Sequence, residues 1–129
     1  MLLGKVLKNI KKKYKNINFN DIRFNSKDCK KNDIFFAING NHTKGSNYID
    51  NAINNGAKVI ISNLKFEGFD KNKILFLKNK DPRKLLSEVS SRYYKSKPKN
   101  IIAITGTNGK TSVANFYNQI LVLNNKKVA

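Results

Sequence analysis

Cysteine, histidine, acidic residues and long apolar stretches are all scarce in this chain of 129 residues. The single cysteine, Cys29, excludes an internal disulfide. No stretch approaches the roughly 20 apolar residues of a membrane-spanning helix, and the apolar residues near the N-terminus are too interrupted for a signal peptide. We therefore expect a soluble, cytoplasmic protein without a membrane partner. The sequence also contains no internal repeat.

The charge balance is strongly basic, with 26 lysine and arginine residues against 8 acidic ones and a net charge of +18. Such a balance invites a nucleic-acid interpretation. However, the positive residues are nearly all lysine, they are scattered over every segment, and asparagine and isoleucine are also abundant. This pattern indicates a compositional bias of the whole chain, because phosphate and base recognition use arginine forks and interleaved aromatic rings. We expect no dedicated nucleic-acid surface.

Apolar periodicity predicts alternating strands and helices. The expected strands lie around Ile22 and at 34–38, 59–61 and 74–77, and the expected helices lie within 1–13, from Ser46 to Gly56, and from the cap Asp81 and Pro82 to Tyr93. The strand, helix, strand order over 34–61 predicts a parallel crossover. Residues 95–100 have no apolar residue except a proline, which indicates a linker and a domain boundary near residue 97.

The strongest motif is the phosphate-loop pattern Gly-Thr-Asn-Gly-Lys-Thr at 106–111. It follows an apolar run at 101–104, expected to be a buried strand, and precedes residues 113–123, which can form a helix. Glycines allow a tight turn, and a helix N-terminus presents free N–H groups to an anion. Lys110 would reach the β- and γ-phosphates, and the Thr111 hydroxyl would ligate Mg²⁺. The strict consensus lacks its first glycine here, so the fit is to a shortened variant, and a plain strand-to-helix turn is the alternative.

The position of this motif predicts the domain organisation. An α/β nucleotide-binding fold needs several βα units after its phosphate loop, and only eighteen residues remain, counting Ser112 itself. We therefore predict an α/β fold with a small N-terminal domain at 1–97. Residues 98–129 would form the first strand, phosphate loop and helix of a truncated, P-loop-like ATP-binding domain.

Three pieces of the sequence, in the same order, resemble the Mur ligases of peptidoglycan biosynthesis. Residues 25–27 with 32–37 look like the family's D-S-R followed by G-D-L-F-V-A. Residues 40–49, then Ala52 and 56–57, resemble G-x-x-x-D-G-x-x-F-I, then A and G-A. Residues 105–112 are similar to the ATP loop T-G-T-N-G-K-T-[ST]. Within the family the resemblance points to the branch that adds the third amino acid to the UDP-N-acetylmuramoyl-dipeptide precursor.

The resemblance implies that the 1–97 domain binds the UDP substrate. Phe24 and Ser26 would lie against the uracil and ribose, and Asn41, His42 and Thr43 would hold the UDP part. Hydroxyl and amide side chains with free loop N–H groups suit a uracil edge and a diphosphate. An ordinary exposed side chain is the alternative for His42, because no second histidine or carboxylate cluster accompanies it as a metal ligand or general base.

The resemblance also implies an ATP site in the phosphate loop. Its residues would be Gly106, Thr107, Asn108, Gly109, Lys110, Thr111 and Ser112. Lys110 and Thr111 would be catalytic, with Lys110 neutralising the phosphates and Thr111 holding Mg²⁺. The cofactors implied are ATP and Mg²⁺.

Four positions depart from the family pattern in the N-terminal domain. Asn25 replaces an aspartate, Lys27 an arginine, Asn32 a glycine and Lys44 an aspartate. Lysine lacks the bidentate fork of arginine, so any anion contact at position 27 is weaker or different. Lys44 reverses a charge in the second loop. All four fit the lysine and asparagine bias of the chain.

The activity implied is ATP-dependent formation of an amide between an amino acid, diaminopimelate or lysine, and UDP-N-acetylmuramoyl-L-alanyl-D-glutamate. The substrate carboxylate would attack the γ-phosphate, and the incoming amine would displace phosphate from the acyl phosphate. Because further domains of the family would lie beyond residue 129, we expect no ligase activity from this chain alone. Alternatives are a stand-alone UDP-sugar-binding module with a vestigial phosphate loop and a small basic nucleic-acid binder. The sequence gives no oligomeric state.

Overall fold

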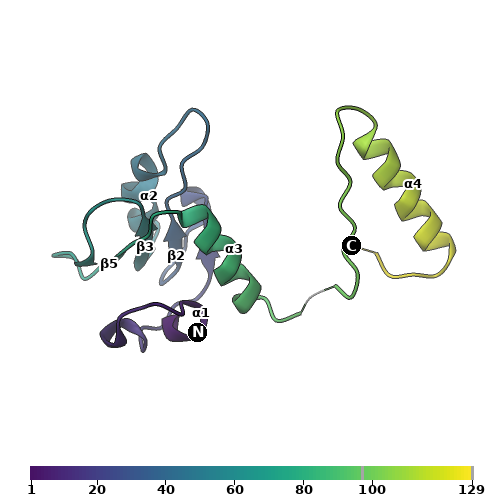
Figure 1. Ribbon diagram of the computed structural model, residues 1–129. Helices are drawn as coiled ribbons and strands as arrows, with labels where there is room; N and C mark the ends of the chain where they lie inside the picture. Colours follow the sequence, from purple (N-terminus) through teal and green to yellow (C-terminus); the bar gives the residue numbers. More distant parts are fainter. Residues whose placement is uncertain (97, 129) are drawn as a thin grey trace. The chain divides into compact units, whose positions relative to one another are not determined.

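The computed structural model of the protein describes residues 1–96 and 98–128. The chain divides into two compact units, Met1–Lys95 and Ser96–Ala129, each described here by itself (Figure 1). Residue 97, near which the sequence places a domain boundary, lies outside the described residues.

The first unit is built on a five-stranded sheet. Its strands are β1 (Ile22–Arg23), β2 (Ile34–Phe36), β3 (Val59–Ser62), β4 (Gly68–Phe69) and β5 (Leu75–Lys78). They lie in the order β1-β2-β3-β5-β4, with β4 antiparallel to β5 and every other pair parallel. The predicted parallel crossover from β2 to β3 is confirmed. Strand β4 was not predicted, because two residues are too few to show a period.

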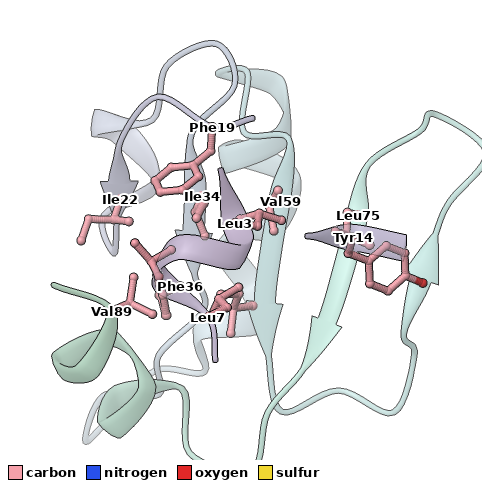
Figure 2. Close-up of a cluster of buried hydrophobic side chains, with 12 residues drawn as sticks. Leu3, Leu7, Tyr14, Phe19, Ile22, Ile34, Phe36, Val59, Leu75 and Val89 are labelled. Atoms are coloured by element: carbon pink, nitrogen blue, oxygen red, sulfur yellow. The ribbon is translucent and has the colours of Figure 1, made fainter. Parts of the chain in front are cut away.

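Helices cover both faces of this sheet, so its central strands are apolar on both sides. Ile34 and Phe36 of β2 point to one face, where they pack with Leu3 and Val89 (Figure 2). Phe35 points to the other face, into a second apolar cluster that includes Ala52. A parallel sheet covered on both faces is coded by continuous apolar runs, which explains the run at 34–38. Each fully buried side chain of this size contributes about 1.5–3 kcal/mol.

The helices of the first unit match the expectations only in part. They are α1 (Leu3–Val6), the 3₁₀ turns η1 (Lys12–Tyr14), η2 (Ser26–Asp28) and η3 (Gly45–Tyr48), α2 (Ile49–Asn54) and α3 (Pro82–Tyr93). The prediction of α3 is confirmed, including its cap, since Asp81 Oδ1 accepts a hydrogen bond from the Lys84 N–H at 3.0 Å. The predicted end of α2 is also confirmed, because Gly56 follows with a φ of 104°.

Two predictions about helices were wrong: the length of the helix within 1–13 and the start of the helix expected at Ser46. The helix expected within 1–13 spans only four residues, and its first two N–H groups, those of Leu3 and Gly4, donate to the carbonyls of Ile17 and Lys15. These long-range bonds hold the segment against the turn at residues 15–17. The helix expected to start at the cap Ser46 begins as a 3₁₀ turn, and Ser46 makes no capping bond.

The second unit contains one helix, α4 (Lys110–Leu123), among its described residues. It starts directly after Gly109, three residues earlier than predicted. The strand expected at 101–104 is absent from the described part of this unit, which offers no neighbouring strand to pair with. A strand needs such a neighbour because its own N–H and C=O groups cannot bond to each other.

Candidate functional site

The residues predicted to bind the UDP substrate lie at one edge of the sheet. Phe24 and Ser26 come directly after β1, and residues 41–43 belong to the loop that follows β2. Strands β1 and β2 are parallel neighbours, so their carboxyl ends meet at the same edge. In open α/β sheets, ligands bind outside the carboxyl ends of the strands. The topology therefore brings the two predicted segments to the edge where a ligand is expected.

The segment after β1 presents one exposed and one buried residue. The Phe24 side chain is 70% exposed, so its ring is free to stack on a flat group. Ser26 is only 5% exposed and begins η2. Its carbonyl accepts a hydrogen bond from Asn55 Nδ2 at 2.9 Å, which ties η2 to the end of α2. Among the described contacts, no hydrogen bond joins Phe24 or Ser26 to the loop after β2.

The loop after β2 has an exposed tip and a fixed base. Asn41, His42 and Thr43 are all exposed, and the tip is closed by a 2.9 Å bond from the Gly40 N–H to the Thr43 carbonyl. At the base, a Cβ on Gly45 would lie 2.4–2.6 Å from backbone atoms of the chain at 37–38, so only glycine fits there. The tip can meet a ligand while its base stays on the sheet.

Asn32, which replaces a glycine of the family pattern, has a φ of 67°. Asparagine is one of the few residues that tolerate this left-handed conformation, so the backbone the glycine would supply is retained. The Asn32 N–H donates to the Gly56 carbonyl at 2.8 Å. Asn32 therefore supplies the left-handed turn that leads into β2.

An ion pair between the buried carboxylate of Asp33 and the half-buried Arg23, which the sequence analysis did not predict, lies at the opposite edge of the same two strands. Asp33 is 1% exposed, and its carboxylate accepts bonds from the N–H groups of Asp21 and Lys30 and from Arg23 Nε, at 3.1, 2.9 and 3.3 Å. The hydrogen bond to Asp33 raises the pKa of Arg23. Arg23 also pairs with Asp21 at 2.6 Å. The pair aligns β1 with β2, and its signal in the sequence is the acid next to the apolar run.

Two openings lie beside these elements. A pocket of about 180 Å³ is lined by residues 37–39 after β2, by Asn63 after β3 and by residues 80–83 at the start of α3. It therefore opens at the same carboxyl edge as the predicted substrate residues. A larger open groove of about 720 Å³ runs between residues 7–14 and α3, and none of the predicted site residues lines it.

The phosphate loop in the second unit has the backbone that its glycines predict. Gly109 has a φ of 76° and stands as the N-terminal cap of α4 without a capping side chain. The first N–H groups of a helix have no partner within it, so they are available to an anion. Lys110 Nζ folds over the loop and donates to the carbonyls of Gly106 and, at 3.0 Å, Thr107. The loop thus combines a positive side chain with a helix N-terminus, which suits a phosphate group.

A metal ion at this loop would depend on few protein ligands. Within 1–96 and 98–128 there is no group of three or more His, Cys, Asp or Glu side chains that could hold a metal. The Thr111 hydroxyl is exposed at the start of α4. One hydroxyl fits Mg²⁺ as it binds in nucleotide sites, where phosphate oxygens and water complete the octahedron.

The single cysteine, Cys29, is free and buried. Burial raises the pKa of the Cys29 thiol to about 11. A buried thiol with such a pKa is a poor nucleophile, because the thiolate is the reactive form.

Across the described ranges, no helix is both long and apolar enough to cross a membrane.

Comparison with known protein families matches residues 18–94 to the Mur ligase family, catalytic domain. The UDP-N-acetylmuramoyl-L-alanyl-D-glutamate--2,6-diaminopimelate ligase of Rickettsia typhi is 38% identical over 122 residues, covering 94% of this chain and 24% of the relative. The ligase of the same name from Clostridium tetani is 43% identical over 120 residues, covering 87% of this chain and 24% of the relative. The chain spans about a quarter of the length of these curated relatives.

Solved structures show the same fold. The MurF ligase of Thermotoga maritima in complex with ADP matches with a TM-score of 0.61 at 24% identity, covering 79% of this chain and 23% of that one. The UDP-N-acetylmuramoylalanyl-D-glutamyl-2,6-diaminopimelate--D-alanyl-D-alanyl ligase of Acinetobacter baumannii matches with a TM-score of 0.57 at 24% identity, covering 81% and 23%. At this identity the likeness concerns the fold alone.

Proposed function

The chain belongs to the Mur ligase family, and on that premise we propose that it supplies the UDP-substrate unit and the phosphate loop of an ATP-dependent ligase. The reaction would add an amino acid to UDP-N-acetylmuramoyl-L-alanyl-D-glutamate in peptidoglycan biosynthesis. One observation carries this proposal. The alignment to the Rickettsia typhi ligase covers 94% of the chain, so it extends past the matched family segment into the phosphate loop at 106–111.

The amino acid we propose is diaminopimelate, because the curated relatives are named for it. Lysine is the other candidate from the sequence. A reaction that consumes ATP and a UDP-linked precursor fits the cytoplasmic location expected from the sequence. The two alternatives, a stand-alone UDP-sugar module and a nucleic-acid binder, gain no support from these names.

In the first unit, the UDP part would bind at the carboxyl edge of β1 and β2. The exposed Phe24 ring would stack against the uracil, and Ser26 would lie beside it. Asn41, His42 and Thr43 would reach the UDP from the tip of the loop after β2, where their side chains are exposed. These roles are supported by the shared edge and by the exposure of four of the five residues.

In the second unit, the residues of the phosphate loop would bind and orient ATP. The N–H groups between Thr107 and Lys110 would cradle the β-phosphate, and the Lys110 ammonium, already over the loop, would neutralise the phosphates. Thr111 would be one ligand of Mg²⁺, with phosphate oxygens completing its shell. ATP, when bound with Mg²⁺, supplies the phosphoryl group that activates the substrate carboxylate.

Isothermal titration of the purified chain tests the two sites separately. We expect UDP-N-acetylmuramoyl-L-alanyl-D-glutamate to bind, and UDP-N-acetylglucosamine to bind as well, because the proposed contacts of the first unit are to the UDP part that both ligands share. We expect Lys110→Met to weaken Mg-ATP binding about tenfold or more while leaving the UDP ligand unaffected. Lys126→Met is the matched control, since it removes the same charge outside the loop.

The same preparation should show no amide formation with ATP, substrate and diaminopimelate. Amide formation by the 129-residue chain would contradict our expectation that it is inactive alone. Failure of the UDP substrate to bind at millimolar concentration, with the sheet intact by circular dichroism, would overturn the proposed function.

A further inference from the structure

The loop after β2 is held at its base by three residues that we call the loop clasp: Asn39, Gly45 and Arg83. Asn39 joins the other two. Its Oδ1 accepts a hydrogen bond from the Gly45 N–H at 2.9 Å, and its backbone carbonyl accepts one from Arg83 Nη2 at 3.0 Å. The first bond closes the loop on itself, and the second attaches it to α3. The loop is the tall one at the top of the first unit in Figure 1.

The clasp is needed because little else orders this loop. Its tip residues are exposed, and inside the loop the described backbone hydrogen bonds comprise only the bond from the Gly40 N–H to Thr43. Gly45 cannot be replaced without a collision with the backbone at 37–38. The conformation of the tip therefore depends on where Asn39 holds the two ends of the loop.

Arg83 is itself placed by a chain of hydrogen bonds along the carboxyl edge of the sheet. The Asn79 N–H donates to the carbonyl of Ser62 at the end of β3, at 2.8 Å. Asn79 Oδ1 accepts from the Asp81 N–H at 2.8 Å, and Asp81 in turn caps α3. The start of α3, and with it the backbone of Arg83, is thus fixed to the ends of β3 and β5.

We propose that Arg83 and Asn39 are positioning residues for the UDP substrate, acting through the exposed tip at 41–43. This inference rests on the proposed function. Arg83 does not touch the tip residues in any described contact; its guanidinium fixes the carbonyl from which the loop begins. A loop held in its binding conformation before the ligand arrives loses less entropy on binding. The pocket of about 180 Å³ between Arg83 and Asn63 lies directly beside the clasp.

Substitutions at neighbouring positions of α3 separate this role from charge. Arg83→Met removes the donor to Asn39, and Lys84→Met removes one positive charge from the same helical turn, where the Lys84 side chain has no described partner. Lys84 contributes to the cap through its backbone N–H alone, so the cap persists. Arg83→Lys is the rescue variant, because one ammonium donor can replace the single bond that Nη2 makes.

The experiment measures binding of UDP-N-acetylmuramoyl-L-alanyl-D-glutamate by calorimetry and amide exchange at Gly45 by NMR, in the full chain. We expect Arg83→Met to raise the Kd about three- to tenfold, as for loss of one charge-assisted hydrogen bond at an exposed site. It should also speed exchange of the Gly45 amide without lowering the melting temperature more than Lys84→Met does. Arg83→Lys should recover part of the affinity, and Lys84→Met should change the Kd less than twofold.

A second pair of variants tests the other half of the clasp. Asn39→Asp keeps an acceptor oxygen for the Gly45 N–H, whereas Asn39→Ala removes it. We expect exchange of the Gly45 amide to stay slow in Asn39→Asp and to become fast in Asn39→Ala. Equal exchange in the two variants would contradict the role assigned to the Asn39 side chain.

The outcomes distinguish this inference from the function on which it rests. If the unaltered chain binds the UDP substrate and Arg83→Met binds it as well as Lys84→Met, the positioning role is overturned and the proposed function stands. If the unaltered chain does not bind the substrate, both are overturned. If Arg83→Met loses affinity but also has a melting temperature below that of Lys84→Met, the inference is overturned as well, because the loss of affinity then reflects general destabilisation.

Discussion

The two units of this chain contain similar local sequence signals and reach very different degrees of packing. In the first unit, apolar side chains of β2, β3 and β5 are buried on both faces of the sheet. In the second unit, no described residue is buried, and α4 leaves Phe116 64% and Leu123 82% exposed. An apolar, well-formed helix is therefore not sufficient for a core; burial needs a second surface, and in the first unit the sheet supplies it.

The sharpest way to break this comparison is to separate the units at the linker. Residues 1–95 should fold alone, with a cooperative urea transition, because their two apolar clusters are complete. A peptide of residues 96–129 should have little helix at 25 °C, since isolated helices of this length are marginal in water. Circular dichroism of the two pieces measures both expectations. A cooperative thermal transition in the peptide would contradict the comparison.

A matched pair of phenylalanine substitutions gives the next largest effect. Phe36→Ala in β2 should lower the free energy of unfolding of the full chain by about 3–5 kcal/mol, because it empties a fully buried site. Phe116→Ala in α4 should change the same transition by less than about 0.5 kcal/mol, as expected for an exposed position. Urea titration followed by fluorescence or circular dichroism measures the difference. Equal effects would mean that α4 is covered in solution.

Two glycines sharpen the comparison at the level of the backbone. Gly45→Ala should destabilise the first unit by about 1–3 kcal/mol, since its Cβ would collide with backbone atoms. Gly109→Ala has open space around its Cβ, so its cost is only the left-handed φ, about 1–2 kcal/mol, and it falls on the phosphate loop. We expect the urea midpoint to fall for the first variant alone and Mg-ATP affinity to fall for the second alone.

A further expected effect, confined to alkaline solution, is a dependence of the stability of the first unit on pH. Burial raises the pKa of Cys29 from 9.0 to about 11, so the folded state disfavours the thiolate. The unfolded chain releases this proton near pH 9, whereas the folded chain releases it only near pH 11. Stability from this group is therefore complete below pH 9 and is lost as the pH rises from 9 to 11. Between pH 9 and 11, the urea midpoint of Cys29→Ala should therefore fall less with rising pH than the midpoint of the unaltered chain.

Apolar runs and helix caps in the sequence correctly predicted the elements that have a neighbouring element to pack against or pair with. The runs at 34–38 and 59–61 gave β2 and β3, and the Asp81-Pro82 pair gave the start of α3, because a cap and an N1 proline act within one turn. The similar run at 101–104 did not give a strand, because no described neighbour pairs with it. The apolar character of a run sets its tendency to be buried, and whether the run forms a strand depends on a neighbouring strand to pair with.

Long-range contacts account for most of what the sequence could not predict. The N–H groups of Leu3 and Gly4 bond to carbonyls of residues 15–17, and the bond from Arg83 to Asn39 joins positions 44 apart. The periodicity of apolar residues does not indicate hydrogen bonds between residues so far apart in the sequence. The candidate site was accessible from sequence only through resemblance, which named residues 41–43 at the tip of the loop and gave no indication of the clasp beneath them. The roles of the tip residues stay predictions.

Asn32 and Gly45 show two different demands that the backbone makes on a chain rich in asparagine and lysine. At Asn32 the chain needs only a left-handed turn, and asparagine can supply one where the family pattern has a glycine. At Gly45 the chain needs the absence of a side chain, and no codon change away from glycine meets that requirement. The backbone at position 32 therefore accepts a side chain that tolerates a positive φ, whereas the backbone at position 45 accepts no side chain at all.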